Sequence, residues 1–262
     1  MNVQSINQIY IKIENLKNDF ENGSSVIAQK GLKIFIHALT IEEIAISDEK
    51  VKMIAAKIIA AKPAMASLKN IIGLAHKVFA SLKGEVNPNK LYDSIQNKIQ
   101  KAREITINIG IDFITNRGIR NIITCSYSST VVHLFKELNL INYPIHTLAL
   151  ESIWKGRDYA DKVIEDCNAH GISAEKIEKN KIDRFDIDCG IIGADAIAKG
   201  AGVINGIPSA TLAEKLKLRN IPLFVIGESF KKTNEIYIED GFQLVFEELI
   251  EEIFCDEVFD FF

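Results

Sequence analysis

A cluster of hydroxyl groups and one thiol stands in the segment TCSYSST, residues 124–130. The segment follows the apolar run IRNIIT and precedes the helical pattern STVVHLFKEL, so Ser128, Ser129 and Thr130 are expected at a helix N-terminus. Free backbone N–H groups and the helix dipole favour an anion such as phosphate at such an end. The same hydroxyls can serve only to cap the helix, and the sequence leaves both interpretations open.

A second candidate is Asp195, in the glycine-rich segment GADAIAKGAGVING that begins at Gly193. An aspartate just past a strand can act as a general acid or base, or it can form a turn or cap a helix. The segment lacks the GxGxxG fingerprint of dinucleotide sites, and the hydroxyl cluster lacks the Gly-x-Ser-x-Gly elbow of serine hydrolases. The four cysteines form no CxxC pair and have no histidine at metal spacing, so we expect reduced thiols, no metal and no cofactor.

The helices and strands that position these candidate residues can be predicted from the spacing of apolar residues. Up to about residue 116 the apolar spacing is helical, and a helical domain is predicted for residues 1–116. Beyond it, IRNIITCS, IHTLALES, DCGIIGADAI and IPLFVIGES are short apolar runs typical of strands buried on both faces, with helical segments between them. ISAEKIE is a weaker strand candidate. We therefore predict an α/β chain in which a doubly wound, Rossmann-like, mainly parallel sheet domain occupies residues 117–262.

In such a sheet, ligands bind beyond the carboxyl ends of the strands. There we expect TCSYSST, ESIWKGRD, GADAIAKGAGVING and GESFKK to converge. The formal charge of −4 argues against direct nucleic-acid binding, and no apolar run reaches the roughly 18 residues of a membrane span. With no signal-peptide pattern, we expect a cytoplasmic protein. The apolar residues of the tail FEELIEEIFCDEVFDFF must either meet a partner or pack on their own sheet.

This arrangement resembles the superfamily of the α, β and δ subunits of translation initiation factor 2B. The superfamily also contains isomerases of methylthioribose 1-phosphate and ribose 1,5-bisphosphate. The resemblance covers most of the chain: ENGSSVIAQKGLKIF and KPAMASLKNII look like its early helices, and GADAI followed by VIN is its most specific element. It implies ligand contacts from Gly23, Ser24, Lys62, Gly193 and Asn205.

The resemblance also shows departures. The isomerases carry a Thr-His-Cys turn whose cysteine works with an aspartate in a Gly-Ala-Asp segment. Here Ser126 stands at the cysteine position, Cys125 at the histidine position, and Asp195 matches the aspartate. The family lysine after the asparagine is replaced by Gly206, and an arginine in the turn after the second strand is replaced by a neutral residue, for which Lys155 or Arg157 can compensate.

Two functions follow from the resemblance. The first is a non-catalytic regulatory or sensing protein that binds a phosphosugar or nucleoside monophosphate, forms a homodimer or larger homo-oligomer through its C-terminal domain, and can meet a translation-factor partner. Arg157 then joins the ligand-binding residues. The second is a divergent aldose–ketose sugar-phosphate isomerase, in which Asp195 and either Ser126 or Cys125 move the protons.

Overall fold

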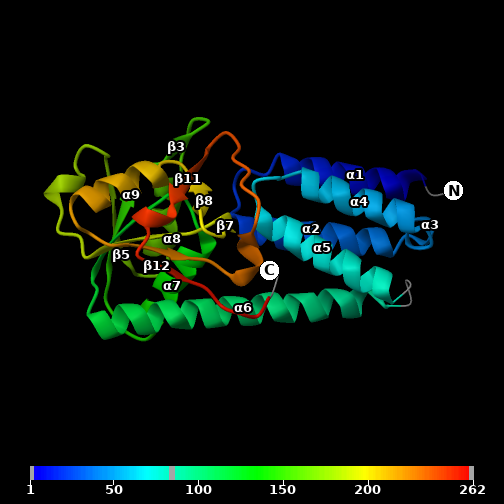
Figure 1. The fold of residues 1–262 in the computed structure, drawn as a ribbon, viewed down its shortest axis with the longest axis horizontal. Coiled ribbons are helices and arrows are strands. Elements are labelled where there is room, and N and C mark those ends of the chain that lie inside the picture. Colours follow the sequence, from blue (N-terminus) through cyan, green and yellow to red (C-terminus); the bar gives the residue numbers. More distant parts are fainter. Residues whose placement is uncertain (1–2, 83–85, 260–262) are drawn as a thin grey trace.

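The structure of the chain, a computed structural model, describes residues 3–82 and 86–259 and consists of a helical part followed by an α/β part (Figure 1). Apolar spacing predicts the helices of the first part, whose buried faces form one hydrophobic core. They are α1 (Val3–Lys17), α2 (Ser24–Leu39), α3 (Glu42–Ala45), α4 (Asp48–Ala60), α5 (Ala66–Ser81) and α6 (Pro88–Arg117).

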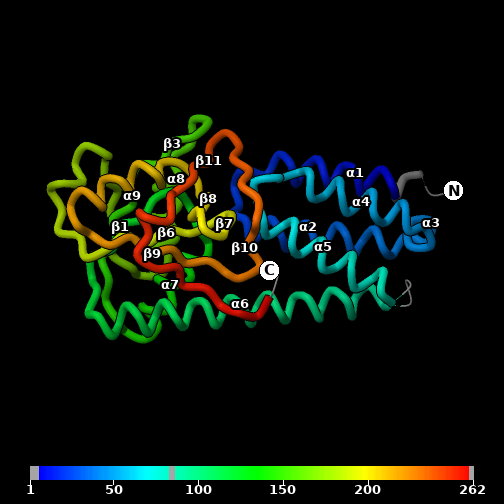
Figure 2. The backbone as a smooth tube through the Cα atoms, in the orientation of Figure 1, coloured from blue at the N-terminus to red at the C-terminus, as the bar shows by residue number. Residues whose placement is uncertain are grey.

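Local chemistry explains where α6 begins and ends. The Asn87 side chain accepts hydrogen bonds from two backbone N–H groups of the first turn, and Pro88 stands where a helix has no partner for an N–H. Gly118 ends the helix at a φ of +69°, a left-handed conformation that glycine tolerates. The helix runs along both parts of the molecule (Figure 2), so its second half packs against the sheet.

The main sheet has six parallel strands in the order β12–β9–β6–β1–β2–β5. The chain starts in the middle at β1, moves outward through β2 and β5, and then continues from β6 to the opposite edge. The carboxyl ends of β1 and β6 therefore flank the switch point where doubly wound sheets bind ligands. The strands are β1 (Asn121–Cys125), β2 (His146–Leu150), β5 (Ser173–Ile177), β6 (Cys189–Ile192), β9 (Leu223–Ile226) and β12 (Glu252–Phe254).

Helices cover both faces of this sheet. On one face lie α7 (Ser129–Leu140), α8 (Tyr159–Asn168) and the second half of α6, and α9 (Ser209–Leu218) lies on the other. The predicted fold class is confirmed, and the weak strand candidate ISAEKIE is β5. None of the helices within residues 3–82 and 86–259 is long and apolar enough to cross a membrane.

The sequence did not predict a second sheet, of order β10–β7–β8–β11. Its central strands lie in the glycine-rich segment GADAIAKGAGVING, and glycine is typical of turns more than of strand interiors, so the sequence indicated a turn there. A two-stranded hairpin projects from the end of β2. The remaining strands are β3 (Ile153–Trp154), β4 (Arg157–Asp158), β7 (Ala196–Ala198), β8 (Gly202–Gly206), β10 (Lys232–Thr233) and β11 (Phe242–Phe246). Three short 3₁₀ turns complete the elements: η1 (Ile182–Arg184), η2 (Ser229–Lys231) and η3 (Glu247–Leu249).

The C-terminal tail packs back on the molecule. Its strand β12 pairs with β9, and Phe254 stacks with Phe224 at 5.4 Å between ring centroids. Phe259 reaches the helical core, where its ring contacts Phe230 edge-on. Of the two expectations for the tail, packing on its own sheet is therefore the one that the structure shows for residues up to 259.

Candidate functional site

A cavity of about 390 Å³ lies between the helical part and the α/β part, at the switch point of the main sheet. This volume falls within the roughly 300–1,000 Å³ of small-molecule sites. The α1–α2 connection and the α4–α5 connection supply one side. The α/β part supplies the other, from residues 126–127, the β3–β4 hairpin, Tyr159, Asp195, residues 206–207, Tyr237 and residues 239–242.

Ser126 stands at the cavity wall in a fixed backbone conformation. It directly follows β1, with a φ of +58° that residues other than glycine rarely adopt. Its N–H donates to the hydroxyl of Ser152 at 2.8 Å, and that hydroxyl donates to the carbonyl of Leu150 at 2.6 Å. A Cβ atom on Gly206 would clash with the Ser126 hydroxyl, so any other residue there would displace this side chain. The ends of β1, β2 and β8 thus hold Ser126 in place.

Asp195 also lines the cavity, with 9% of its surface exposed. Burial raises the pKa of its carboxyl group, while the charge of Lys231 and hydrogen bonds from the hydroxyl and backbone N–H of Ser24 act in the opposite direction. A carboxyl group that keeps its proton more tightly than usual suits a general acid. Because Ser24 is the first residue of α2, the same contacts join that helix to the α/β part. The position of Asp195 thus suits an acid–base group and a helix cap equally.

The predicted phosphate cradle at the start of α7 is nearly filled by its own side chains. The space there is only about 10 Å³, enough for about one water molecule. The Ser128 hydroxyl accepts from the N–H of Val131 at 3.4 Å and so caps α7, and Gly193 leaves room for it, since a Cβ atom there would clash with this hydroxyl. Asn205 is 96% buried and its Nδ2 has no partner among the described residues. The space is lined by residues 23–25, 127–129, 194–195, Asn205 and Lys231.

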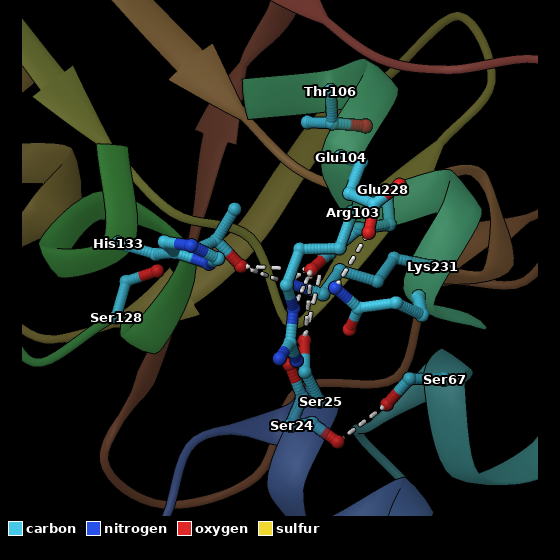
Figure 3. A network of polar contacts seen from close by, with 12 residues as sticks. Ser24, Ser25, Ser67, Arg103, Glu104, Thr106, Ser128, His133, Glu228 and Lys231 are labelled. Atoms are coloured by element: carbon cyan, nitrogen blue, oxygen red, sulfur yellow. Dashed lines mark hydrogen bonds and ion pairs between the residues drawn. The ribbon is translucent and has the colours of Figure 1, made fainter. Parts of the chain in front are cut away.

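Behind this space lies a buried network around Glu228 (Figure 3). Its carboxylate lies 2.8 Å from Nζ of Lys231 and accepts from the hydroxyl of Thr130 at 3.1 Å and from that of Ser25. Arg103, from α6, approaches to 3.5 Å. Burial opposes ionisation of Glu228, but Lys231 and Arg103 outweigh it and hold the pKa at about 2. The network therefore ties α2, α6 and α7 to the segment after β9.

The three remaining candidates lie in different surroundings. Lys62 is 6% exposed, lines the cavity, and places Nζ 4.0 Å from the ring centroid of Phe20. Burial lowers the pKa of Lys62, and Glu239 and Asp19 oppose that change.

Arg157 does not line the cavity, because its guanidinium group pairs with Glu21 at 2.9 Å. The thiol of Cys125 packs in the hydrophobic core beside the sheet, where burial raises its pKa to about 12.

The structure thus gathers the predicted residues in two adjoining spaces. Gly23, Ser126, Lys62 and Asp195 line the main cavity, and Ser24, Ser128, Ser129 and Asn205 line the small one behind it. Gly193 and Thr130 support these walls through packing and hydrogen bonding, whereas Cys125 and Arg157 lie outside them.

Sequence reasoning missed the aromatic wall and the buried lysine of the network. Trp154 belongs to the two-residue strand β3, and Phe20 and Tyr237 lie in connections, so spacing along the sequence does not predict which way these rings face. Lys231 had a signal, because GESFKK follows a strand whose carboxyl end faces the cavity.

The comparisons with known proteins agree with this architecture. The sequence profile of the initiation factor 2 subunit family matches residues 18–251. A translation initiation factor eIF-2B subunit 2-like protein of Pyrococcus furiosus is 27% identical over 226 residues, which are 84% of this chain and 77% of that protein. The ribose 1,5-bisphosphate isomerase of Archaeoglobus fulgidus is 24% identical over 196 residues, which are 70% of this chain and 59% of that protein.

Two solved structures share the fold. The translation initiation factor eIF-2B of Pyrococcus horikoshii superposes with a TM-score of 0.80 at 18% identity and covers 94% of both chains. A chain of the tetrameric eIF2B-beta2-delta2 complex of C. thermophilum gives a TM-score of 0.71 at 14% identity, over 94% of this chain and 88% of that one. At such low identities these likenesses establish the fold alone.

Proposed function

The chain belongs to the initiation factor 2 subunit family, and we propose that it acts there as a non-catalytic sensing protein that binds a phosphosugar or a nucleoside monophosphate. The observation that carries the proposal is the 390 Å³ cavity at the switch point of the sheet. Its walls come from both the helical part and the α/β part, so an occupant contacts both. Occupancy can therefore change how the two parts sit together, and a partner protein can detect that change.

Two residues support the absence of catalysis. The resemblance places the catalytic thiol of the isomerases at Ser126, whose hydroxyl is far less acidic than a thiol with its ordinary pKa of about 8.5. The nearby thiol of Cys125 packs in the core, away from the cavity, with its pKa raised to about 12 by burial. A proton shuttle between adjacent carbons needs an acid and a base. At the two positions that the resemblance equates with the catalytic pair of the isomerases, the cavity has Asp195 and a serine.

An alternative function is a divergent sugar-phosphate isomerase, and the position of Asp195 is the observation that favours it. Asp195 and Ser126 line the same cavity, and burial raises the pKa of the aspartate. In this alternative Asp195 carries the proton between the two carbons. The variant Asp195→Asn would then abolish turnover while the ligand still binds.

We further propose that the protein works in the cytoplasm with a translation-factor partner and forms homodimers or larger homo-oligomers through its α/β part. What supports self-association is that one of the neighbours in fold is a chain of the tetrameric eIF2B-beta2-delta2 complex of C. thermophilum. Light scattering at micromolar concentration should give at least twice the chain mass of 29.3 kDa. A monomer would contradict the self-association.

A thermal-shift screen of pentose phosphates, pentose bisphosphates and nucleoside monophosphates tests the binding proposal. A true ligand at a hundredfold excess over its Kd adds about 2.7 kcal/mol to the free energy of unfolding, which raises Tm clearly. Each hit is then incubated with the protein and followed by NMR. Stabilisation without conversion supports sensing, conversion that Asp195→Asn abolishes supports the isomerase, and no hit among these compounds contradicts both.

A further inference from the structure

The β10–β11 connection, residues 234–241, is an irregular loop that leaves the second sheet, reaches the helical part and returns. In Figure 1 it is the orange segment between the two parts of the molecule. Tyr237 and residues 239–241 line the main cavity. The connection is therefore one wall of the proposed binding site, although it belongs to neither a helix nor a strand that would hold it rigidly.

The connection borders the mouth of the cavity. The lining residues that are exposed to solvent come from both parts and include Phe20 and Pro63 on the helical part and Tyr237 and Asp240 on the connection. Asp195, by contrast, is 9% exposed and lies at the inner end. A ligand on its way to Asp195 therefore passes the connection.

Two polar contacts fasten the connection to the helical part. The carboxylate of Glu235 pairs with Nζ of Lys69, on α5, at 2.6 Å. The carboxylate of Glu239 accepts from the backbone N–H of Ala64, in the α4–α5 connection, at 2.7 Å. Both members of the ion pair are exposed, and such pairs contribute little to stability in water. Lys69 and Glu235 lie outside the cavity wall, so they fasten the connection without touching an occupant.

Apolar packing holds the middle of the connection weakly. The side chains of Ile236, Tyr237 and Ile238 are about half exposed. A segment with little buried apolar surface opens at a low cost in free energy while the rest of the fold stays intact. Opening of the connection is thus a local event.

The two ends of the connection, in contrast, are fixed. Before it, the amide of Asn70 donates to the carbonyls of Phe230 and Lys232 at 3.0 and 2.8 Å. At its end, the carbonyl of Gly241 accepts from the N–H of Ile207 at 2.9 Å. A segment that is fixed at both ends and loosely held between them can swing about those ends, as lids of binding sites do.

We propose that the β10–β11 connection is a lid that opens and closes the mouth of the cavity, and that the contacts of Glu235 with Lys69 and of Glu239 with Ala64 are its latch. The structure shows the latched state. Opening breaks both contacts and admits or releases the ligand, and closing brings Tyr237 back against the cavity. This inference rests on the proposed binding function and adds that the lid sets the rates of ligand entry and exit.

The chain carries its own reporter for this motion. Trp154 is its single tryptophan, lines the cavity, and donates from its indole N–H to Asp240 of the lid at 3.3 Å. The test mixes the full chain with ribose 5-phosphate in a stopped-flow fluorimeter and measures the association and dissociation rate constants. We expect Lys69→Ala and Glu235→Ala each to raise both rate constants about two- to threefold, the loss of one exposed ion pair. Their ratio, Kd, should stay unchanged, because the latch holds the lid in the free and in the occupied protein.

The two variants separate a latch from an electrostatic effect, because they change the net charge in opposite directions. If Lys69 and Glu235 acted by attracting and repelling the anionic probe, one variant would slow association and the other would speed it. The matched control is Lys50→Ala, which breaks an exposed ion pair with Glu43 beside α3, at the end of the helical part that lies away from the α/β part (Figure 1). The control should leave both rate constants unchanged.

A second measurement needs no ligand. Hydrogen exchange of the Ala64 N–H, which donates to Glu239, is followed by NMR, and it should be two- to threefold faster in both latch variants than in the wild type. Unchanged exchange in both variants, or opposite effects of the two on association, would overturn the lid, and binding of ribose 5-phosphate would still uphold the proposed function. If the wild type binds neither ribose 5-phosphate nor any compound of the thermal-shift screen, the proposed function fails, and exchange of the Ala64 N–H still decides on the lid.

Discussion

The buried pair of Glu228 and Lys231 should be among the most sensitive points of the fold. Their exposed fractions are 0% and 2%, and the charged atoms lie 2.8 Å apart. The variant Glu228→Gln keeps the shape of the side chain but removes its charge. It therefore leaves the Lys231 ammonium buried without its closest counter-charge, while Arg103 also loses a partner. Loss of one member of a buried pair is far more costly than loss of one member of a surface pair.

The shifted pKa of Glu228 gives the size of its contribution to the free energy of unfolding. The pKa of Glu228 is lowered from 4.5 to about 2, because Lys231 and Arg103 outweigh the effect of burial. At about 1.4 kcal/mol for each pKa unit, the ionised form contributes about 3 kcal/mol to the free energy of unfolding at neutral pH. Breaking buried pairs generally costs about 3–5 kcal/mol. Since the folded pKa is depressed, this contribution is present above pH 4.5 and is lost as the pH falls towards 2.

Urea denaturation at neutral pH measures the change in the free energy of unfolding. The matched control is Glu178→Gln, whose partner Lys181 is also three residues away but exposed, and it should cost less than about 1 kcal/mol. The double variant Glu228→Gln with Lys231→Met should be more stable than Glu228→Gln alone, because it removes the unpaired charge. If Glu228→Gln costs no more than Glu178→Gln, the buried pair does not stabilise the fold.

Three further predictions concern single residues. Ser128→Ala removes the cap of α7 and should cost about 1 kcal/mol in thermal denaturation, and an unchanged Tm would contradict the capping role. Gly241 has a φ of +88° and lies so close to the Trp154 ring that a Cβ atom would come within 2.5 Å of it. The variant Gly241→Ala should therefore lower the free energy of unfolding by about 1–3 kcal/mol and weaken the binding of ribose 5-phosphate as measured by ³¹P NMR. The buried thiol of Cys125, with its pKa raised to about 12, should resist iodoacetamide at pH 8 in the native protein and react in urea. Mass spectrometry of the modified peptides measures the extent of labelling. Rapid labelling of the native protein would contradict the prediction by showing that the thiol is accessible.

Much of the fold follows from patterns that are local in the sequence. The strands β1, β2, β6 and β9 are nearly continuous apolar runs and the helices between them have a helical period, so the parallel sheet and its carboxyl edge were predictable. The second sheet was not, because β7 and β8 lie in the glycine-rich segment of residues 193–206, whose composition is typical of a turn. The pairing of β8 with β11 joins segments far apart in the chain, which spacing along the sequence does not encode.

In the candidate site, too, some positions could be predicted from the local sequence and others depend on distant segments. Asp195 and Ser126 both line the cavity, and their place at the carboxyl edge of the sheet could be predicted because each follows a core strand. The helix N-terminus that carries Ser128 was also evident, but whether it stays open to an anion depends on side chains that reach it from other segments. Lys155 faces the cavity only because of a two-residue turn, and Arg157 turns away only because Glu21 lies beside it.

The most direct measurement of the central claim is a ³¹P NMR spectrum of the wild-type chain with an equimolar amount of the ligand that gives the largest rise in Tm. We predict that the phosphate resonance shifts or broadens on binding and that no resonance of an isomerised product appears after long incubation. A new product resonance would make the protein an enzyme, and an unperturbed ligand resonance would mean that the cavity does not bind phosphorylated compounds.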